Sequence, residues 1–156
     1  MVRDQSIGFI RRRQAHEALI HRVDAEMAAG RKSPVDRDLA ADGVDEILRV
    51  FAGGIPDWAT FEPEGIELRI TATDVGQTWG AAFGKMKGTS PNTETTYDLP
   101  ALTVGIDAVE PNVVISGGAA DLDLWLWGRG TQDVLDVSGD QSLAPRLREL
   151  MAEATQ

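Results

Sequence analysis

Hydrophobic residues recur with helical spacing in the first thirty positions of the chain. Apolar residues that are four positions apart form one stripe: Ala15, Leu19, Val23 and Met27. No proline interrupts residues 11–24, and Gly30 stands where a helix would end. The pattern therefore predicts one amphipathic helix that includes residues 11–24.

A second helix is expected over residues 36–52, after Ser33 and Pro34, which are typical of a helix start. Its apolar stripe is well defined: Val44, Ile47, Leu48 and Phe51. Gly43 is the position where we expect this helix to kink. A glycine-rich stretch at residues 53–56 ends it.

A period of two replaces the helical period after residue 65. Ile66, Leu68 and Ile70 alternate with polar residues, as in a half-buried strand. The remaining expected elements are strands at residues 77–83, 101–106, 112–116 and 134–138, a polar loop at residues 84–98, and helices at residues 119–128 and 141–154. The sequence therefore predicts an α+β fold, with two N-terminal helices followed by a mostly antiparallel sheet packed with two helices.

The aromatic side chains are expected to serve packing. Trp58 and Phe61 follow the second helix in a connecting segment and are interpreted as core anchors. Trp125 and Trp127 are two positions apart on a helix, so they point to different faces, and we expect at least one of them in the core.

Composition narrows the possible chemistry. The chain has 156 residues, which suits one domain or one domain with an appendage, and 42% of them are hydrophobic, which is enough for a packed core. It has no cysteine, so disulfides, thiolate metal sites and cysteine nucleophiles are excluded. No apolar run has the length of a membrane span, and no signal peptide is visible, so we expect a soluble cytoplasmic protein.

Charge argues against nucleic acid as a partner. The net charge is −10, but residues 1–32 carry seven Lys/Arg and four Asp/Glu, so the rest of the chain is strongly acidic. Nucleic-acid binding would require a basic surface. The basic run of Arg11, Arg12 and Arg13 is therefore interpreted as a solvated helix face, or as one that docks on the acidic part of the protein.

Glu17 and His21 are the candidate metal ligands. They are four residues apart and share one face of the first helix, where a carboxylate and an imidazole can bind one divalent metal ion. Asp24 follows on nearly the same face. The ordinary alternative is a solvated ion pair between Glu17 and His21.

Two blocks of sequence resemble the mycothiol-dependent maleylpyruvate isomerase family. The first is Arg13-x-x-His16-Glu17-x-x-x-His21-Arg22-x-Asp24, and the second runs from Asp121 through Leu-Trp-Leu-Trp-Gly to Arg129, followed by Gly139-Asp140. Members of this family join a DinB-like four-helix bundle to a small α+β domain that is similar to sterol-carrier-like folds. The resemblance divides the chain into residues 1–56, from the bundle, and residues 57–156, the α+β domain.

The resemblance also implies ligands and a reaction. In the family, the matching Glu and second His, here Glu17 and His21, bind a divalent metal, usually zinc. A further His from an earlier bundle helix has no counterpart in this chain, which looks like a member that lacks the first bundle helices. The family reaction is the isomerisation of maleylpyruvate to fumarylpyruvate, in which mycothiol adds to the double bond and leaves after rotation; relatives transfer the thiol.

Arg129 is the candidate catalytic residue. The chemistry needs a cation that binds substrate carboxylates, and the planar fork of arginine suits that role. The alternative is a surface arginine near a helix C-terminus. Arg22 and Arg13 are weaker candidates. Asp24 and His16 are considered as hydrogen-bond partners of the metal ligands, although His16 lies about 100° from Glu17 around the helix, which argues against it.

Two further hypotheses remain open. The α+β domain could instead be a non-catalytic module that binds an apolar small molecule or supports a partner protein. In the family, three other bundle helices cover the first helix, whereas here only the second helix is available. We therefore expect an exposed apolar surface on residues 9–30 and a possible homodimer through the first helix.

Overall fold

The computed structural model describes residues 6–155; residues 1–5 and 156, which the expected division of the chain includes, lie outside it. The elements in chain order are α1 (Ile7–Ala28), α2 (Arg37–Glu46), the π-helix η1 (Ile47–Ala52), β1 (Ala59–Ala72), β2 (Gln77–Thr89), β3 (Thr96–Val104), β4 (Val113–Gly117), α3 (Ala119–Leu126), the 3-10 turn η2 (Gln132–Val134), β5 (Asp136–Gly139) and α4 (Leu143–Ala154). The predicted α+β fold is confirmed. None of the described helices is long and apolar enough to cross a membrane.

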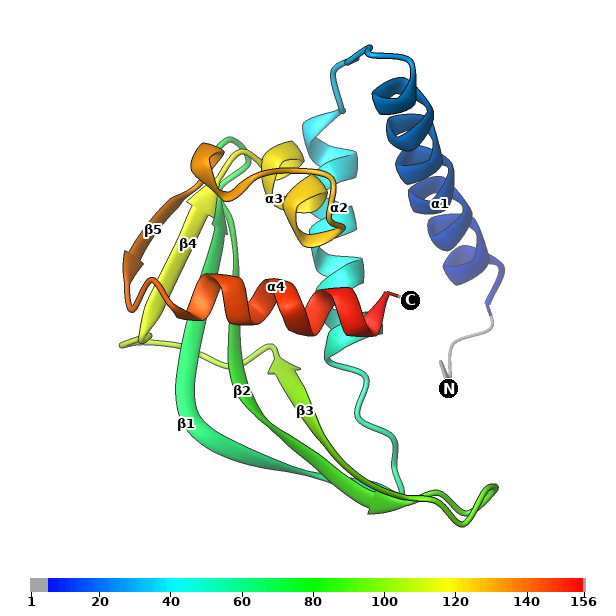
Figure 1. Ribbon diagram of the computed structural model, residues 1–156, viewed down its shortest axis with the longest axis vertical. Coiled ribbons are helices and arrows are strands. Elements are labelled where there is room, and N and C mark those ends of the chain that lie inside the picture. The colour runs from blue at the N-terminus through cyan, green and yellow to red at the C-terminus, as the bar shows by residue number, and fades with distance from the viewer. Residues whose placement is uncertain (1–5, 156) are drawn as a thin grey trace.

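The five strands form one sheet in the order β3-β2-β1-β4-β5. Only the β1–β4 pairing is parallel; the other three pairings are antiparallel. Buried side chains alternate along β1, where Leu68, Ile70 and Ala72 lie on the covered face. The helices α2, α3 and α4 pack on the sheet, and α1 lies outside α2 (Figure 1).

The apolar core lies between the sheet and these helices. Val44, Ile47 and Leu48 on the second helical segment are fully buried with Leu122 of α3 and Leu147 of α4. The second helical segment therefore shares one core with the sheet. The division of the chain after residue 56 stays a prediction.

The predicted loop at residues 84–98 is wrong. β2 continues to Thr89 and β3 begins at Thr96, so only residues 90–95 connect them. This extension is held by cross-strand polar pairs, such as the ion pair of 2.6 Å between Lys87 Nζ and Glu62 Oε2. Because neither face of the extension is buried deeply, it lacks the alternation that indicates a strand.

Strand β1 also begins earlier than expected, at Ala59, and a register shift between Pro63 and Ile66 interrupts its pairing with β2. Phe61 therefore lies in a strand. Neither Trp58 nor Phe61 is a core anchor, because both side chains are only half-buried. Trp58 instead packs against Tyr97 of β3, with ring centroids 5.6 Å apart.

Gly43 does not kink the second helix. The helix runs through it and widens to a π-helix only at Ile47. A Cβ at position 43 would lie 2.7 Å from Oδ1 of Asp123, so glycine is required here for the close approach of α3. The glycine at position 43 therefore marks a close contact between two helices and not a kink.

This contact buries a carboxyl group. Asp123 is 1% exposed, and neither of its oxygens has a hydrogen-bond partner among residues 6–155. Burial, followed by repulsion from the buried Glu46, raises the pKa of Asp123 to about 8. The side chain is therefore mostly protonated at neutral pH.

We expect Asp123→Asn to stabilise the protein at neutral pH. Because the folded pKa of about 8 lies above the ordinary 3.8, the folded protein keeps a proton that the unfolded chain releases, and stability falls as pH rises between these values. At about 1.4 kcal/mol per pH unit, the substitution should add up to about 4 kcal/mol at pH 7 and flatten this slope.

Urea denaturation between pH 4 and pH 9 measures this effect. The control is Asp121→Asn, the same change on the same helix at a side chain that is not buried. A pH dependence that is unchanged in Asp123→Asn would contradict the assignment of the buried proton to Asp123.

Candidate functional site

Helix α1 is attached to α2 mainly by charged side chains. We call this set the ionic seam: Arg12, Arg13 and His16 of α1 with Asp42, Asp45 and Glu46 of the α2 helix. Arg12 Nε donates to Asp42 Oδ2 at 2.8 Å, and Arg13 Nη1 donates to Glu46 Oε2 at 2.8 Å. The basic run thus docks on the acidic part of the protein through its second and third arginines, while Arg11 is exposed.

The seam holds His16 away from the predicted metal ligands, whereas Arg13 contacts both the seam and Glu17. His16 is 1% exposed, and its Nε2 lies 2.7 Å from Asp42 Oδ2, so it does not contact a metal ligand. Arg13 is held by Glu46, and its guanidinium lies 4.6 Å from the centroid of the Phe51 ring. Arg22, the other weaker candidate, donates to the carbonyl of Pro34 at 3.3 Å.

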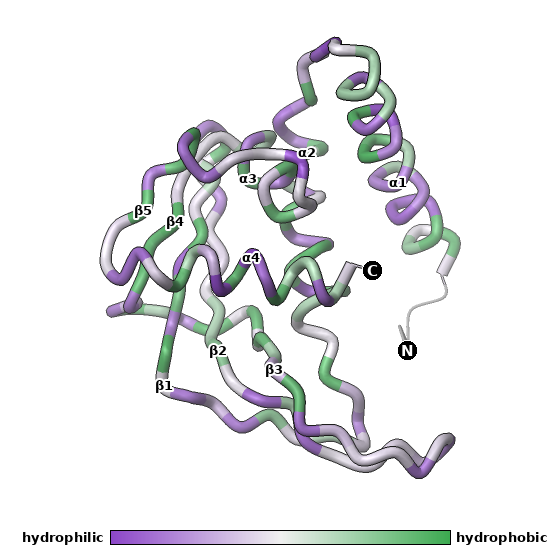
Figure 2. The backbone as a smooth tube through the Cα atoms, in the orientation of Figure 1, coloured by the Kyte–Doolittle hydropathy of each residue, from purple (hydrophilic) through white to green (hydrophobic). Residues whose placement is uncertain are grey.

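Few apolar residues join α1 to the body. Of the expected stripe, only Leu19 and Val23 are buried, with Ile20 beside them, whereas Met27 is 55% exposed. Ala15 is exposed as well, because the buried face of α1 is rotated toward His16. Figure 2 shows that hydrophilic and hydrophobic segments alternate along α1, which agrees with a helix attached by both charged and apolar side chains.

Glu17 and His21 lie together, as their spacing predicts. Glu17 Oε2 is 3.5 Å from His21 Nε2, and the two side chains are 41% and 75% exposed. Glu17 also accepts a hydrogen bond from Arg13. Among residues 6–155, no group of three His, Asp or Glu side chains is placed to hold a metal ion. The metal site therefore stays a prediction, for which this pair supplies two ligands.

The Arg129 side chain is only partly exposed. It crosses to α1, where Nε and Nη2 donate to the two carboxylate oxygens of Asp24 at 2.8 and 2.9 Å. Its Nη1 donates to the carbonyl of Trp127. Asp24, considered above as a partner of the metal ligands, is instead the bidentate partner of Arg129.

Both members of this ion pair stay charged. The hydrogen bonds from Arg129 lower the pKa of Asp24, and the same bonds raise the pKa of Arg129. These contacts use three of the five N–H groups of the guanidinium. Two N–H groups remain for a further acceptor, so Arg129 is oriented by Asp24 without being saturated.

The pair brings Arg129 to the metal-ligand face of α1. Glu17, His21 and Asp24 are spaced by four and three residues, so they lie on one face of the helix. The hydrogen bond from Arg129 is the main cause of the lowered pKa of Asp24, and the charge of His21 adds to it. Arg129, far from α1 in the sequence, therefore contacts the helix that carries Glu17 and His21.

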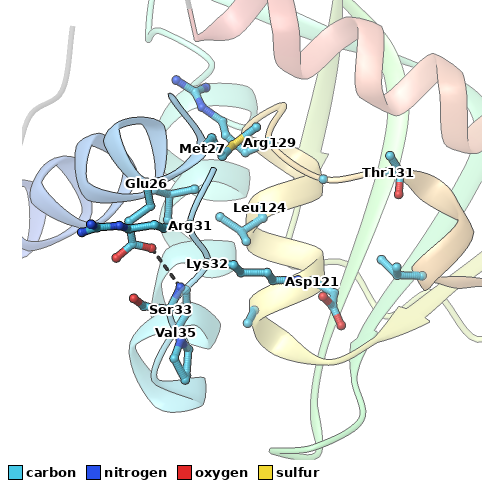
Figure 3. Close-up of a pocket in the computed structure, with 15 residues that line it drawn as sticks. Glu26, Met27, Arg31, Lys32, Ser33, Val35, Asp121, Leu124, Arg129 and Thr131 are labelled. Carbon is cyan, nitrogen blue, oxygen red and sulfur yellow. Dashed lines mark hydrogen bonds between the residues drawn. The ribbon is translucent and has the colours of Figure 1, made fainter. Parts of the chain in front are cut away.

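A pocket of about 480 Å³ lies next to this pair, between the end of α1, the connector to α2, and α3. Its lining mixes apolar side chains with Lys32, Asp121 and Arg129, and the hydrogen bond from Ser33 N to Glu26 closes one side (Figure 3). Asp24 does not line the pocket, so the ion pair lies at its edge.

Residues 38–146 match the family described as the MDMPI C-terminal domain, which is the C-terminal domain of mycothiol-dependent maleylpyruvate isomerases. The chain belongs to this family. No curated protein matches the chain. The matched stretch includes Arg129 and the core elements around it, whereas Glu17, His21 and Asp24 lie before it.

The family assignment covers the half of the site that carries Arg129. The ion pair between Asp24 and Arg129 then connects α1 to that half by direct contact. Sequence reasoning did not single out Asp123, Glu46 or Arg148, because each is one charged residue in a helix with a clear apolar stripe. Only the packing of other helices against them distinguishes them.

We expect Arg129→Lys to loosen α1, because lysine cannot make the bidentate contact with Asp24. The pair is 29% and 40% exposed, so the loss should be about 1 kcal/mol at most. Hydrogen exchange of α1 amides should accelerate equally in Arg129→Lys and Asp24→Asn. Arg11→Lys, a change of an exposed arginine on the same helix, is the control. An unchanged exchange rate in both variants would contradict the docking role.

Proposed function

We propose that the protein takes part in metal-assisted, thiol-dependent cis–trans isomerisation or thiol transfer, acting on a small substrate that carries a carboxylate. Family membership supports the reaction class. The single observation that carries the proposal is the bidentate contact of Arg129 with Asp24, on the helix face that bears Glu17 and His21. In this proposal, the contact holds the substrate-binding cation beside the predicted metal ligands.

The residues present fit part of a zinc site. Carboxylate and imidazole are ordinary zinc ligands, and Glu17 and His21 are close enough to close on one ion, but a catalytic site normally has three protein ligands. In this proposal the third ligand comes from outside the described residues. A bound zinc ion would lower the pKa of a thiol and hold it as thiolate.

The thiol is supplied by a cosubstrate. The chain has no cysteine, so the nucleophile that adds to the double bond cannot be its own. We propose mycothiol for this role, from the family. Among the chain's own residues, Glu17 and His21 would hold the metal ion that activates the thiol, and Arg129 would orient the acceptor.

Arg129 binds the substrate carboxylate through the end of its fork that Asp24 leaves unused. The same positive charge stabilises the enolate that develops when the thiol adds beside a carbonyl group. Because Asp24 fixes the guanidinium before substrate binds, little conformational entropy is lost on binding. Asp24 is thus a positioning residue for Arg129.

A non-catalytic module for an apolar ligand is not favoured. That hypothesis would be supported by an apolar cavity within the sheet domain. The pocket described above instead lies between α1 and α3, and charged side chains such as Lys32 and Asp121 contribute to its lining.

We also propose that α1 associates with a second copy of the chain. Ile7 and Ile10 are 71% and 52% exposed on α1, and only one face of this helix is covered. Sedimentation velocity should show a dimer that weakens in Ile10→Ser. A monomer at high concentration, with α1 amides fully protected from exchange, would contradict this proposal.

Zinc titration tests the metal site. Because the chain supplies two ligands, we expect binding no tighter than micromolar, and we expect His21→Ala to abolish it. Isothermal titration calorimetry measures this directly, and Glu149→Gln, which changes an exposed carboxylate on α4, is the control. Tight binding that survives His21→Ala would show that the metal lies elsewhere.

Turnover tests the function. With zinc and mycothiol present, the protein should accelerate isomerisation of a cis-unsaturated oxo dicarboxylate, followed by ultraviolet absorbance. Arg129→Lys should lower kcat about a hundredfold, because a donor to the developing charge is lost, whereas Arg11→Lys should not. Absence of a thiol-dependent reaction at saturating zinc would contradict the proposed function.

A further inference from the structure

Arg148 of α4 is a second arginine at the site, and it rests on Gly128. A Cβ at position 128 would lie 3.0 Å from Nη2 and 3.2 Å from Nη1 of Arg148. Gly128 has φ 91°, which is unfavourable for other residues. The glycine that ends α3 thus gives the guanidinium of Arg148 room beside Arg129, the next residue.

Arg148 has no acidic partner among residues 6–155. By contrast, Arg129 is paired with Asp24, and Arg146, on the same helix as Arg148, donates to Glu64 Oε2 at 2.7 Å. The guanidinium of Arg148 is half-buried. Burial, followed by repulsion from Arg129, lowers the pKa of Arg148.

Only one of these two neighbouring cations has a carboxylate partner. Asp24 neutralises one positive charge, and the pair of arginines keeps an excess of one. An anion placed between them would relieve the repulsion and accept charge-assisted hydrogen bonds from both. Each guanidinium is planar and directs its N–H groups like a fork, and this geometry matches the two oxygens of a carboxylate group.

We propose that Arg148 and the free end of Arg129 together bind one carboxylate group of the substrate, beside Gly128. This inference rests on the proposed function and adds a second substrate-binding residue to it. It also defines the ligand: an anion with a planar carboxylate, held between the end of α3 and α4.

Binding of maleate to the full chain, at low salt and without metal or thiol, tests this site. Calorimetry gives the affinity, and the neutral dimethyl ester of maleate tests the need for charge. Arg148→Gln should weaken maleate binding about tenfold or more, because charge-assisted hydrogen bonds are lost. Arg148→Lys should restore part of the affinity, since lysine keeps the charge without the fork.

The matched control is Arg146→Gln, which removes the same charge from the same helix two residues away. It should bind maleate as the parent does. The melting temperature of Arg148→Gln should stay equal or rise, because the substitution removes the repulsion with Arg129. A clear fall in melting temperature would assign Arg148 to the fold and overturn the proposal.

The remaining outcomes separate this inference from the proposed function. If Arg129→Gln loses maleate binding while Arg148→Gln keeps it, the role of Arg148 is wrong and the proposed function stands. Equal weakening in Arg146→Gln would show a response to overall charge alone and would also overturn it. If the parent protein does not bind maleate, both the inference and the role of Arg129 fail.

Discussion

The position of α1 depends on the ionic seam. A helix packed on a broad apolar face is held by many small contacts that tolerate adjustment. Here only Leu19, Ile20 and Val23 provide buried apolar contacts, and directional hydrogen bonds from Arg12 and Arg13 fix the helix instead. Such bonds define the rotation and the register of α1 against α2.

The ionic seam also includes a carboxyl group whose burial is energetically unfavourable. Glu46 is fully buried, with one oxygen bonded to Arg13 and the other without a partner among residues 6–155. Close by, Asp123 adds a second carboxyl group. A buried ion pair contributes little net stability. Removing one of its partners is costly, however, because the other charge is then buried without compensation, and this favours a single arrangement over similar alternatives. Geometry at the site is thus maintained at the expense of stability.

Much of the fold can be predicted from the sequence, because helices and strands with one buried face have regularly spaced hydrophobic residues. The stripe of the second helix, the alternation in β1 and the final helix all have one face in the core. The extension of β2 and β3 was missed, since a polar strand without a buried face has no period. Gly43 was interpreted as a kink because a glycine needed for the approach of Asp123 looks the same in sequence.

The site was predictable only where its members are local. The spacing of Glu17 and His21 fixes their proximity, whereas the partner of Arg129 depends on how α1 is placed. Arg148 and Arg146 differ by two positions in one helix, and residues of other elements, among them Gly128 for the first and Glu64 for the second, give them different surroundings.

The contact between Asp24 and Arg129 joins residues that are 105 positions apart. Closing so long a loop is entropically unfavourable until the sheet between them has formed. During synthesis, the first helix leaves the ribosome long before its partner exists. Arg129 therefore reaches Asp24 only after strands β1 to β4 have been synthesised, and a chain that stops before Arg129 cannot fix α1 by this ion pair.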